Sequence, residues 1–206
     1  GVRITPKNEL ELRINRFQTL LVQQGIDAAV LLQNADLFYF TGSIQQGICY
    51  IPAVGEPLYL VRKDFGRARM ESGIKQIVPL ASMRDVAGQL KEHGIDLPQR
   101  LGMELDVLPV GLFNRWRKVL GGGETCDVSP LIRSVKSIKS DYEIAIMKDC
   151  GLLMDKIYQR AKEVIQVGKT DLEVSAELEF LARKEGHQGI TRFRGFNSEL
   201  FYGHAF

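Results

Sequence analysis

Histidine and cysteine are the side chains most often found at catalytic and metal sites, and this chain has three of each. Cys49, Cys126 and Cys150 are widely spaced, odd in number and form no CxxC pair. This pattern predicts reduced, buried thiols that fill the core. His93 is expected in the last turn of a helix, where an imidazolium interacts favourably with the helix dipole, and His187 is expected at the surface.

The third histidine, His204, lies in the aromatic stretch FRGFNSELFYGHAF, residues 193 to 206. Two interpretations remain open for it: a strand histidine that is packed or exposed, and a functional residue. The spacing of His187, Glu199 and His204 fits no closed zinc pattern. We therefore predict no metal ligands in this chain and keep His204 as its one candidate catalytic residue.

Other signatures narrow the function classes. The sequence contains no GxSxG, HExxH, GxxxxGK[ST] or GxGxxG motif, and GGG at 121–123 follows a predicted helix, the wrong order for a phosphate-binding loop. A net charge of +2 gives no reason to expect nucleic acid as a partner. Apolar runs such as AAVLL at 28–32 are too short to cross a membrane, and the first residues have no signal-like apolar run. The expected location is the cytoplasm.

Helix signals are clear near the start of the chain. A first helix is predicted, capped by Thr5 and ending at Gly25. Its apolar positions repeat at spacings of four, three and four: Leu10, Ile14, Phe17 and Leu21. Gly73 and Gly94 are each followed by isoleucine, as Gly25 is, so the same left-handed helix ending is predicted at both.

Short apolar segments alternate with these helices. They are DAAVLL (27–32), GICYIPAV (47–54), PLYLVR (57–62), KQIVPL (75–80), RLGMEL (100–105) and ETCDV (124–128). The turn at 55–57 joins two of them as a hairpin. We predict an α/β domain over residues 1–132, with a mixed sheet that contains one antiparallel pair.

A second domain is predicted over residues 133–206. SPLIRSVKSIKSD, residues 129–141, is interpreted as a solvated basic connector. Two helices follow, with capping boxes at Ser140 and Thr170, and then two strand-like segments, 189–196 and 200–206. The helices have apolar faces but little partner surface in the remaining residues. We expect this domain to be incomplete, and its helices to be mobile, protease-sensitive or packed against another copy.

Two stretches resemble a known family. NADLFYFTG (34–42) and RSVKSIKSDYEIAIMKDCG (133–151) are similar to segments of the creatinase, prolidase and aminopeptidase P group, the pita-bread metallopeptidases. The order of elements agrees with that group. The resemblance implies an α/β fold: an N-terminal mixed-sheet domain with a ribonuclease H-like topology, followed by the truncated start of an α+β pita-bread domain.

The resemblance also implies a function. Family members bind two divalent metals (Mn, Co or Zn) through Asp, Asp, His, Glu and Glu, and activate water to attack the peptide bond before proline. The family places all five ligands after the segment that resembles FYGHAF. We therefore expect an inactive N-terminal fragment of a cytoplasmic Xaa-Pro dipeptidase or aminopeptidase, with no cofactor in this chain. The expected partners are a proline-containing peptide, in the full-length protein, and a second copy in a homodimer.

In several family members the N-terminal domain packs over the active site of the neighbouring subunit. By position, this resemblance assigns Tyr39, Thr41 and Gly42 to a substrate-side loop. The alternative is a buried aromatic corner, with Tyr39 packed under the sheet.

Three other functions remain open. Creatinase-type amidinohydrolases share the architecture. A peptidase-like module without metals, such as that of a histone-chaperone subunit, would bind peptide or protein without turnover. An independent α/β domain that dimerises through its last helices is the third.

Overall fold

The computed structural model describes residues 4–121, 123–195 and 199–201, which divide into two compact units. The first contains the described residues up to Ile138 together with Arg194 and Gly195. The second contains Lys139–Phe193 and the strand at 199–201. Among these residues, every helix falls short of the combined length and apolarity needed to cross a membrane.

The first unit is built on a six-stranded sheet. Its strands are β1 (Ala28–Leu31), β2 (Gly47–Pro52), β3 (Leu58–Val61), β4 (Gln76–Pro79), β5 (Arg100–Met103) and β6 (Glu124–Asp127), in the order β4-β3-β2-β1-β5-β6. β1, β5 and β6 run parallel, as do β3 and β4. β2 is antiparallel to both β1 and β3. The predicted mixed sheet is confirmed, with two antiparallel pairings where one was expected.

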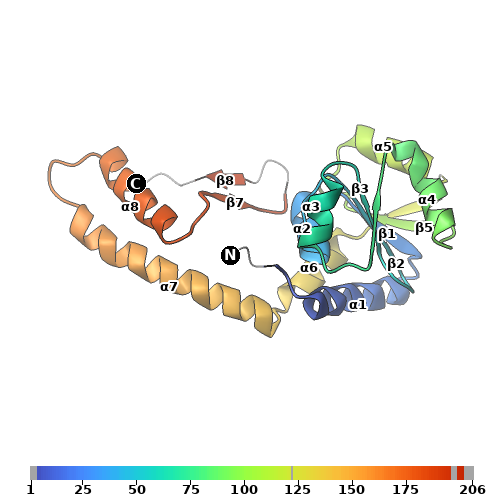
Figure 1. Ribbon diagram of the computed structural model, residues 1–206, viewed down its shortest axis with the longest axis horizontal. Coiled ribbons are helices and arrows are strands. Elements are labelled where there is room, and N and C mark those ends of the chain that lie inside the picture. The colour runs from blue at the N-terminus through green and yellow to red at the C-terminus, as the bar shows by residue number, and fades with distance from the viewer. Residues whose placement is uncertain (1–3, 122, 196–198, 202–206) are drawn as a thin grey trace. The chain divides into compact units, whose positions relative to one another are not determined.

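Helices cover both faces of this sheet (Figure 1). One face packs against α1 (Lys7–Gln23), α2 (Asn34–Thr41), α3 (Phe65–Glu71) and α6 (Ser129–Ser137). The other packs against the 3₁₀ turn η1 (Met83–Asp85), α4 (Val86–Glu92) and α5 (Val110–Val119). Successive strand residues point to opposite faces, so Ala29 and Leu31 enter the first core and Ala28 and Val30 the second.

The helix starts and ends follow the predictions in part. α1 begins after Pro6, and no side chain caps it, so the predicted Thr5 cap is wrong. Gly25 has a φ of 63°, and the backbone N–H of Ile26 donates to the Leu21 carbonyl at 2.9 Å, as the left-handed ending requires. Gly94, with a φ of 70°, ends α4 in the same way.

The same ending is absent at Gly73. α3 ends at Glu71, and the extended Ser72 leads the chain away from it. A Cβ on Gly73 would lie 3.1 Å from the Cα of Lys7. This glycine therefore serves the close approach of the loop to α1, and not a left-handed turn.

The predicted connector is largely a helix. α6 covers Ser129–Ser137, with Pro130 in its first turn, so the predicted domain boundary between residues 132 and 133 falls inside this helix. Ile132 and Val135 are buried in the core of the first unit, and α6 packs beside α1. The interpretation as a solvated linker is therefore wrong. Ile132 and Val135 are three positions apart, so they lie on one face of a helix, but the basic residues between and around them suggested a solvated segment.

The second unit contains α7 (Asp141–Val164), α8 (Asp171–Lys184) and an antiparallel hairpin of β7 (Ile190–Arg192) and β8 (Glu199–Phe201). Both predicted capping boxes are present, at Ser140 with Glu143 and at Thr170 with Glu173. Residues 202–206 of the second predicted strand lie outside the described residues.

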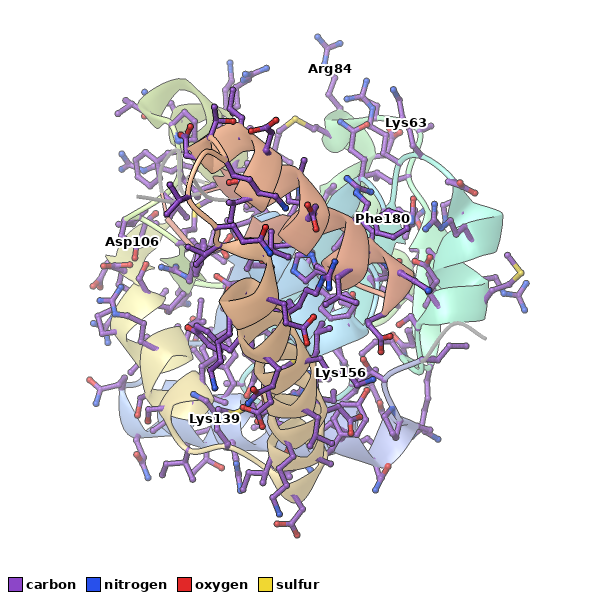
Figure 2. The ribbon with its side chains drawn as sticks, turned by 90° about the vertical axis from the view of Figure 1, so that its left-hand side faces the viewer. Lys63, Arg84, Asp106, Lys139, Lys156 and Phe180 are labelled. Carbon is purple, nitrogen blue, oxygen red and sulfur yellow. The ribbon has the colours of Figure 1, made fainter. Side chains whose placement is uncertain are left out.

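Large apolar side chains on both helices of this unit face solvent. Phe180 of α8 is 70% exposed (Figure 2). α7 exposes Ile144, Met147, Leu152, Met154 and Tyr158. Cys150 is also exposed, so its predicted place in a core is wrong, whereas Cys49 is fully buried and Cys126 partly buried. The mobility expected of α7 and α8 stays a prediction.

The packing of α6 can be tested by one truncation. Ile132→Ala should lower the free energy of unfolding by about 2–5 kcal/mol, because it removes a fully buried side chain and leaves a cavity. Ile138→Ala, at an exposed position just after the helix, should change it by less than about 0.5 kcal/mol. Urea denaturation of both variants checks this. Equal small effects would restore the linker interpretation.

Candidate functional site

Tyr39, Thr41 and Gly42 lie at the end of a helix. α2 begins after Gln33, whose side-chain oxygen accepts hydrogen bonds from the backbone N–H groups of Ala35 and Asp36. It ends at Gly42, which has a φ of 77°. The chain therefore makes the sharp turn predicted for Gly42, while the other two residues belong to the helix and not to a loop.

Thr41 is fully buried. Its hydroxyl lies 2.7 Å from the Leu37 carbonyl oxygen and accepts a hydrogen bond from the backbone N–H of Ser43 at 3.1 Å. It therefore ties the last turn of α2 to the residues that follow. These contacts give Thr41 a structural role in the turn.

The Tyr39 ring is half-buried and contacts two cations. The Arg13 guanidinium lies 4.2 Å from its centroid and the Lys136 ammonium 4.9 Å. Arg13 also donates to the Tyr39 carbonyl and forms a buried ion pair with Glu9. The ring meets Phe40 edge to face. These contacts join α1, α2 and α6 at one point.

A carboxylate braces the loop after Gly42. Glu71, at the end of α3, accepts hydrogen bonds from the Ser43 hydroxyl at 2.7 Å and the Gln45 amide at 3.2 Å. Arg67 pairs with its other oxygen. Partial burial raises the pKa of Glu71, but these donors outweigh it and hold that pKa below the usual value. The loop is thus fixed by a charged anchor.

Sequence reasoning missed a second group, at the end of the parallel strands β1 and β5. From β1 the chain passes to α2 on one face of the sheet, and from β5 to α5 on the other. Asp36 of α2 and Glu104, directly after β5, are both fully buried at this divergence. Two neighbouring buried carboxyl groups cannot both be ionised at low cost.

Glu104 is the member of this pair whose pKa is raised. Its Oε2 accepts hydrogen bonds from the backbone N–H groups of Leu32 at 2.7 Å and Gln33 at 3.0 Å. Burial, together with the hydrogen bond and the charge of Asp36, raises the pKa of Glu104 well above its usual value, against the opposing effect of the two N–H groups. Oε1 is buried and has no hydrogen-bond partner among the described residues.

Asp36 is the member of this pair whose pKa is lowered. Burial by itself would raise its pKa, but the hydrogen bond from Glu104 and the contacts of Lys136 and Arg194 outweigh burial and lower it. Lys136 of α6 contacts Oδ1, and the Arg194 Nε donates to Oδ2 at 2.6 Å. The buried carboxylate is therefore paired on both oxygens.

Asp106, labelled in Figure 2, extends the cluster toward solvent. It accepts hydrogen bonds from the Ser129 hydroxyl at 2.6 Å and from Arg133 at 2.7 Å, and it pairs with Arg194. Partial burial raises the pKa of Asp106, but these donors, led by Arg194, bring it below the usual value. Arg194 thus contacts both aspartates.

The three histidines add little to this site. The Nδ1 of His93 lies 2.8 Å from the Gln89 carbonyl oxygen at the end of α4, where the sequence predicted it. His187 is half-buried, not fully at the surface, and its Nδ1 accepts from the Gly189 N–H. His204 lies outside the described residues. Within those residues, no three His, Cys, Asp or Glu side chains gather to hold a metal ion.

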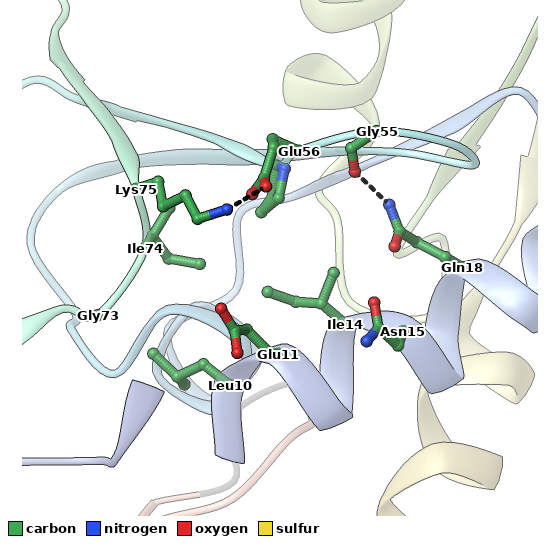
Figure 3. A pocket seen from close by; sticks show the side chains of 11 residues that line it. Leu10, Glu11, Ile14, Asn15, Gln18, Gly55, Glu56, Gly73, Ile74 and Lys75 are labelled. Atoms are coloured by element: carbon green, nitrogen blue, oxygen red, sulfur yellow. Dashed lines mark hydrogen bonds and ion pairs between the residues drawn. The ribbon is translucent and has the colours of Figure 1, made fainter. Parts of the chain in front are cut away.

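A hollow of about 230 Å³ lies elsewhere, between α1 and the β2–β3 turn (Figure 3). Lys75 and Glu56 form an ion pair at 2.5 Å across it, and the Gln18 amide donates to the Gly55 carbonyl at 2.8 Å. Four of its lining residues are thus joined in two pairs that link the turn to Lys75 and to α1. We therefore interpret the hollow as the seam where the hairpin attaches to α1.

Residues 13–138 match the family model of the creatinase/prolidase N-terminal domain. The match covers more than half of the chain and includes α2, the turn at Gly42 and the two buried acids Asp36 and Glu104. The chain belongs to this family.

Individual relatives agree with that assignment. The chain is 28% identical over 177 residues to an Xaa-Pro dipeptidase of Pyrococcus horikoshii, covering 84% of this chain and 48% of the relative. The solved Xaa-Pro dipeptidase of Bacillus anthracis superimposes with a TM-score of 0.79 at 26% identity, covering 89% of this chain and 51% of that one. The prolidase of Pyrococcus horikoshii gives 0.75 at 25%, covering 87% and 50%. The chain spans about half the length of the curated relatives it matches.

The raised pKa of Glu104 predicts a pH effect on stability. Its pKa is higher folded than unfolded, so its contribution is present below the unfolded value, about 4.3, and is lost as pH rises through the folded value. Glu104→Gln keeps a donor and an acceptor but has no proton to lose. We expect the variant to lose less unfolding free energy than the wild type between pH 5 and pH 8.

Urea denaturation at each pH measures this difference. Parallel pH curves for the two proteins would contradict the assignment.

Asp36 and Asp106 affect the pH dependence of stability in the opposite sense. Their pKa values are lower folded than unfolded, so they stabilise the fold above about pH 4, and this contribution is lost on acidification.

Proposed function

We propose that this chain is the N-terminal part of a cytoplasmic, dinuclear-metal Xaa-Pro dipeptidase or aminopeptidase that hydrolyses the peptide bond before proline. The observation that carries the proposal is the family match over residues 13–138, shared with relatives named Xaa-Pro dipeptidase along about half their length. The proposal includes two divalent metal ions, Mn, Co or Zn, held by residues outside this chain. The chain alone is then inactive.

The proposed role of this part is to frame a substrate site. In a homodimer, the corner formed by the end of α2 and the loop after Gly42 would face the active site of the neighbouring subunit. Phe38 and Ile44 support this role, because these apolar side chains on either side of Gly42 are 50% and 40% exposed. The anchor at Glu71 supports it too, since a substrate wall must keep its shape.

The activity is tested by comparing two proteins. One is the 206-residue chain, and the other is the product of the reading frame continued past Phe206, both assayed on Xaa-Pro dipeptides with added Mn²⁺ or Co²⁺. We expect turnover by the longer protein and none by the shorter. A longer protein that binds the peptides without cleaving them would overturn the enzymatic proposal and favour a binding module.

The corner is tested in the longer protein. The double substitution Phe38→Ala with Ile44→Ala should lower kcat/KM by about tenfold, which corresponds to about 1.4 kcal/mol of transition-state stabilisation. The melting temperature should change little, because both side chains are already partly in solvent. Val54→Ala, 83% exposed on the β2–β3 turn, is the matched control and should leave both unchanged. An unchanged kcat/KM in the double variant would remove the corner from the substrate site.

A further inference from the structure

The buried acids lie where an α/β sheet commonly binds a ligand. In open sheets, the crevice outside the carboxyl ends of parallel strands, at the point where successive connections leave to opposite faces, is the usual binding position. β1 and β5 are such a pair, since they are parallel neighbours whose following helices, α2 and α5, cover opposite faces. This position is acidic here, because Asp36 follows β1 and Asp106 follows β5.

One side chain of the same chain contacts both aspartates. The Arg194 guanidinium donates from Nε to Asp36 at 2.6 Å and from Nη1 to Asp106. The Arg194 side chain is 10% exposed and the Asp36 side chain 0%. Nη2 is buried with no acceptor among the described residues, so the contacts that hold the guanidinium are those to the two aspartates.

The other charged groups near the two aspartates do not bridge them as Arg194 does. Lys136 contacts the other oxygen of Asp36, and Arg133 reaches Asp106 with a side chain that is 57% exposed. Glu104 pairs with Asp36 and faces Leu32 and Gln33. A planar guanidinium presents two nitrogens to two separate carboxylates at once, which a single ammonium group does less well.

We propose that Asp36 and Asp106 form a guanidinium-binding socket on the first unit, and that Arg194 is its resident occupant. Arg194 lies 158 positions after Asp36 and two positions after the end of β7. The socket therefore attaches the segment Arg194–Gly195 to the first unit. Shortening Arg194 would remove the guanidinium and leave the two aspartates in place. A soluble guanidinium compound should then bind to them.

Chemical rescue of the 206-residue protein tests the socket. Arg194→Ala should lower the melting temperature by about 5–10 °C, because it leaves a buried carboxylate oxygen without its charged donor. Methylguanidinium at about 10–50 mM should restore at least half of that loss, since tethered groups have effective concentrations in the millimolar range. The same concentration of methylammonium, at equal ionic strength, should restore much less.

Two further variants serve as controls. Arg133→Ala removes another arginine from the same Asp106 oxygen, but from the exposed side, and should change the melting temperature by less than about 2 °C. Asp36→Asn combined with Arg194→Ala lacks the buried charge and should show no rescue. If Arg194→Ala does not fold unaided, the yield of folded protein after refolding in methylguanidinium, compared with methylammonium, becomes the readout.

The results separate the alternatives. Selective rescue by methylguanidinium that disappears in the double variant supports the socket. Equal rescue by both cations would show a site for any positive charge and would overturn a guanidinium socket. A melting temperature unchanged by Arg194→Ala, or a loss that neither cation restores, would also overturn it.

Discussion

The carboxylate of Asp36 is charged and has no contact with solvent, and much of the first unit is arranged around that constraint. A buried charge is costly unless each of its oxygens is paired. Here the pairing groups come from three separate parts of the chain: Glu104 after β5, Lys136 on α6 and Arg194 after β7. The apolar core gives the unit its stability, while this cluster requires these segments to adopt one specific arrangement.

The same constraint bears on the proposed substrate corner, because Asp36 and Tyr39 lie on one short helix. Lys136 contacts both the Asp36 carboxylate and the Tyr39 ring, so α6 holds α2 by an ion pair and a cation–π contact together. Arg13 of α1 contacts the same ring. The turn at Gly42 begins at the end of this helix and its loop is anchored by Glu71. A change that displaced α2 would therefore move the corner.

Local signals in the sequence predicted the mixed sheet, the hairpin, the Gly25 and Gly94 endings and both capping boxes, because each depends on neighbouring residues. The ion cluster was missed because its members are separated by up to 158 positions and are held together by tertiary packing. An acid directly after a buried strand, such as Glu104 in RLGMEL, was the available signal. Lys136 was assigned to a solvated connector, since nothing local shows that its charge meets a buried aspartate. Cys150 was expected in a core because it belongs to a helical stripe of apolar residues. Among the described residues, that stripe is exposed at Cys150.

The most direct test of this account is the titration of individual carboxyl groups. Carbon-13 NMR of selectively labelled protein, followed from pH 3 to pH 9, reports the protonation of Asp36 and Glu104 separately. The account predicts that Asp36 loses its proton at a pH below the usual pKa of aspartate. Glu104 should lose its proton only at a pH well above the usual pKa of glutamate. Two carboxyl groups that titrate together in the ordinary range would show that neither is buried and paired, and would contradict the arrangement on which the site rests.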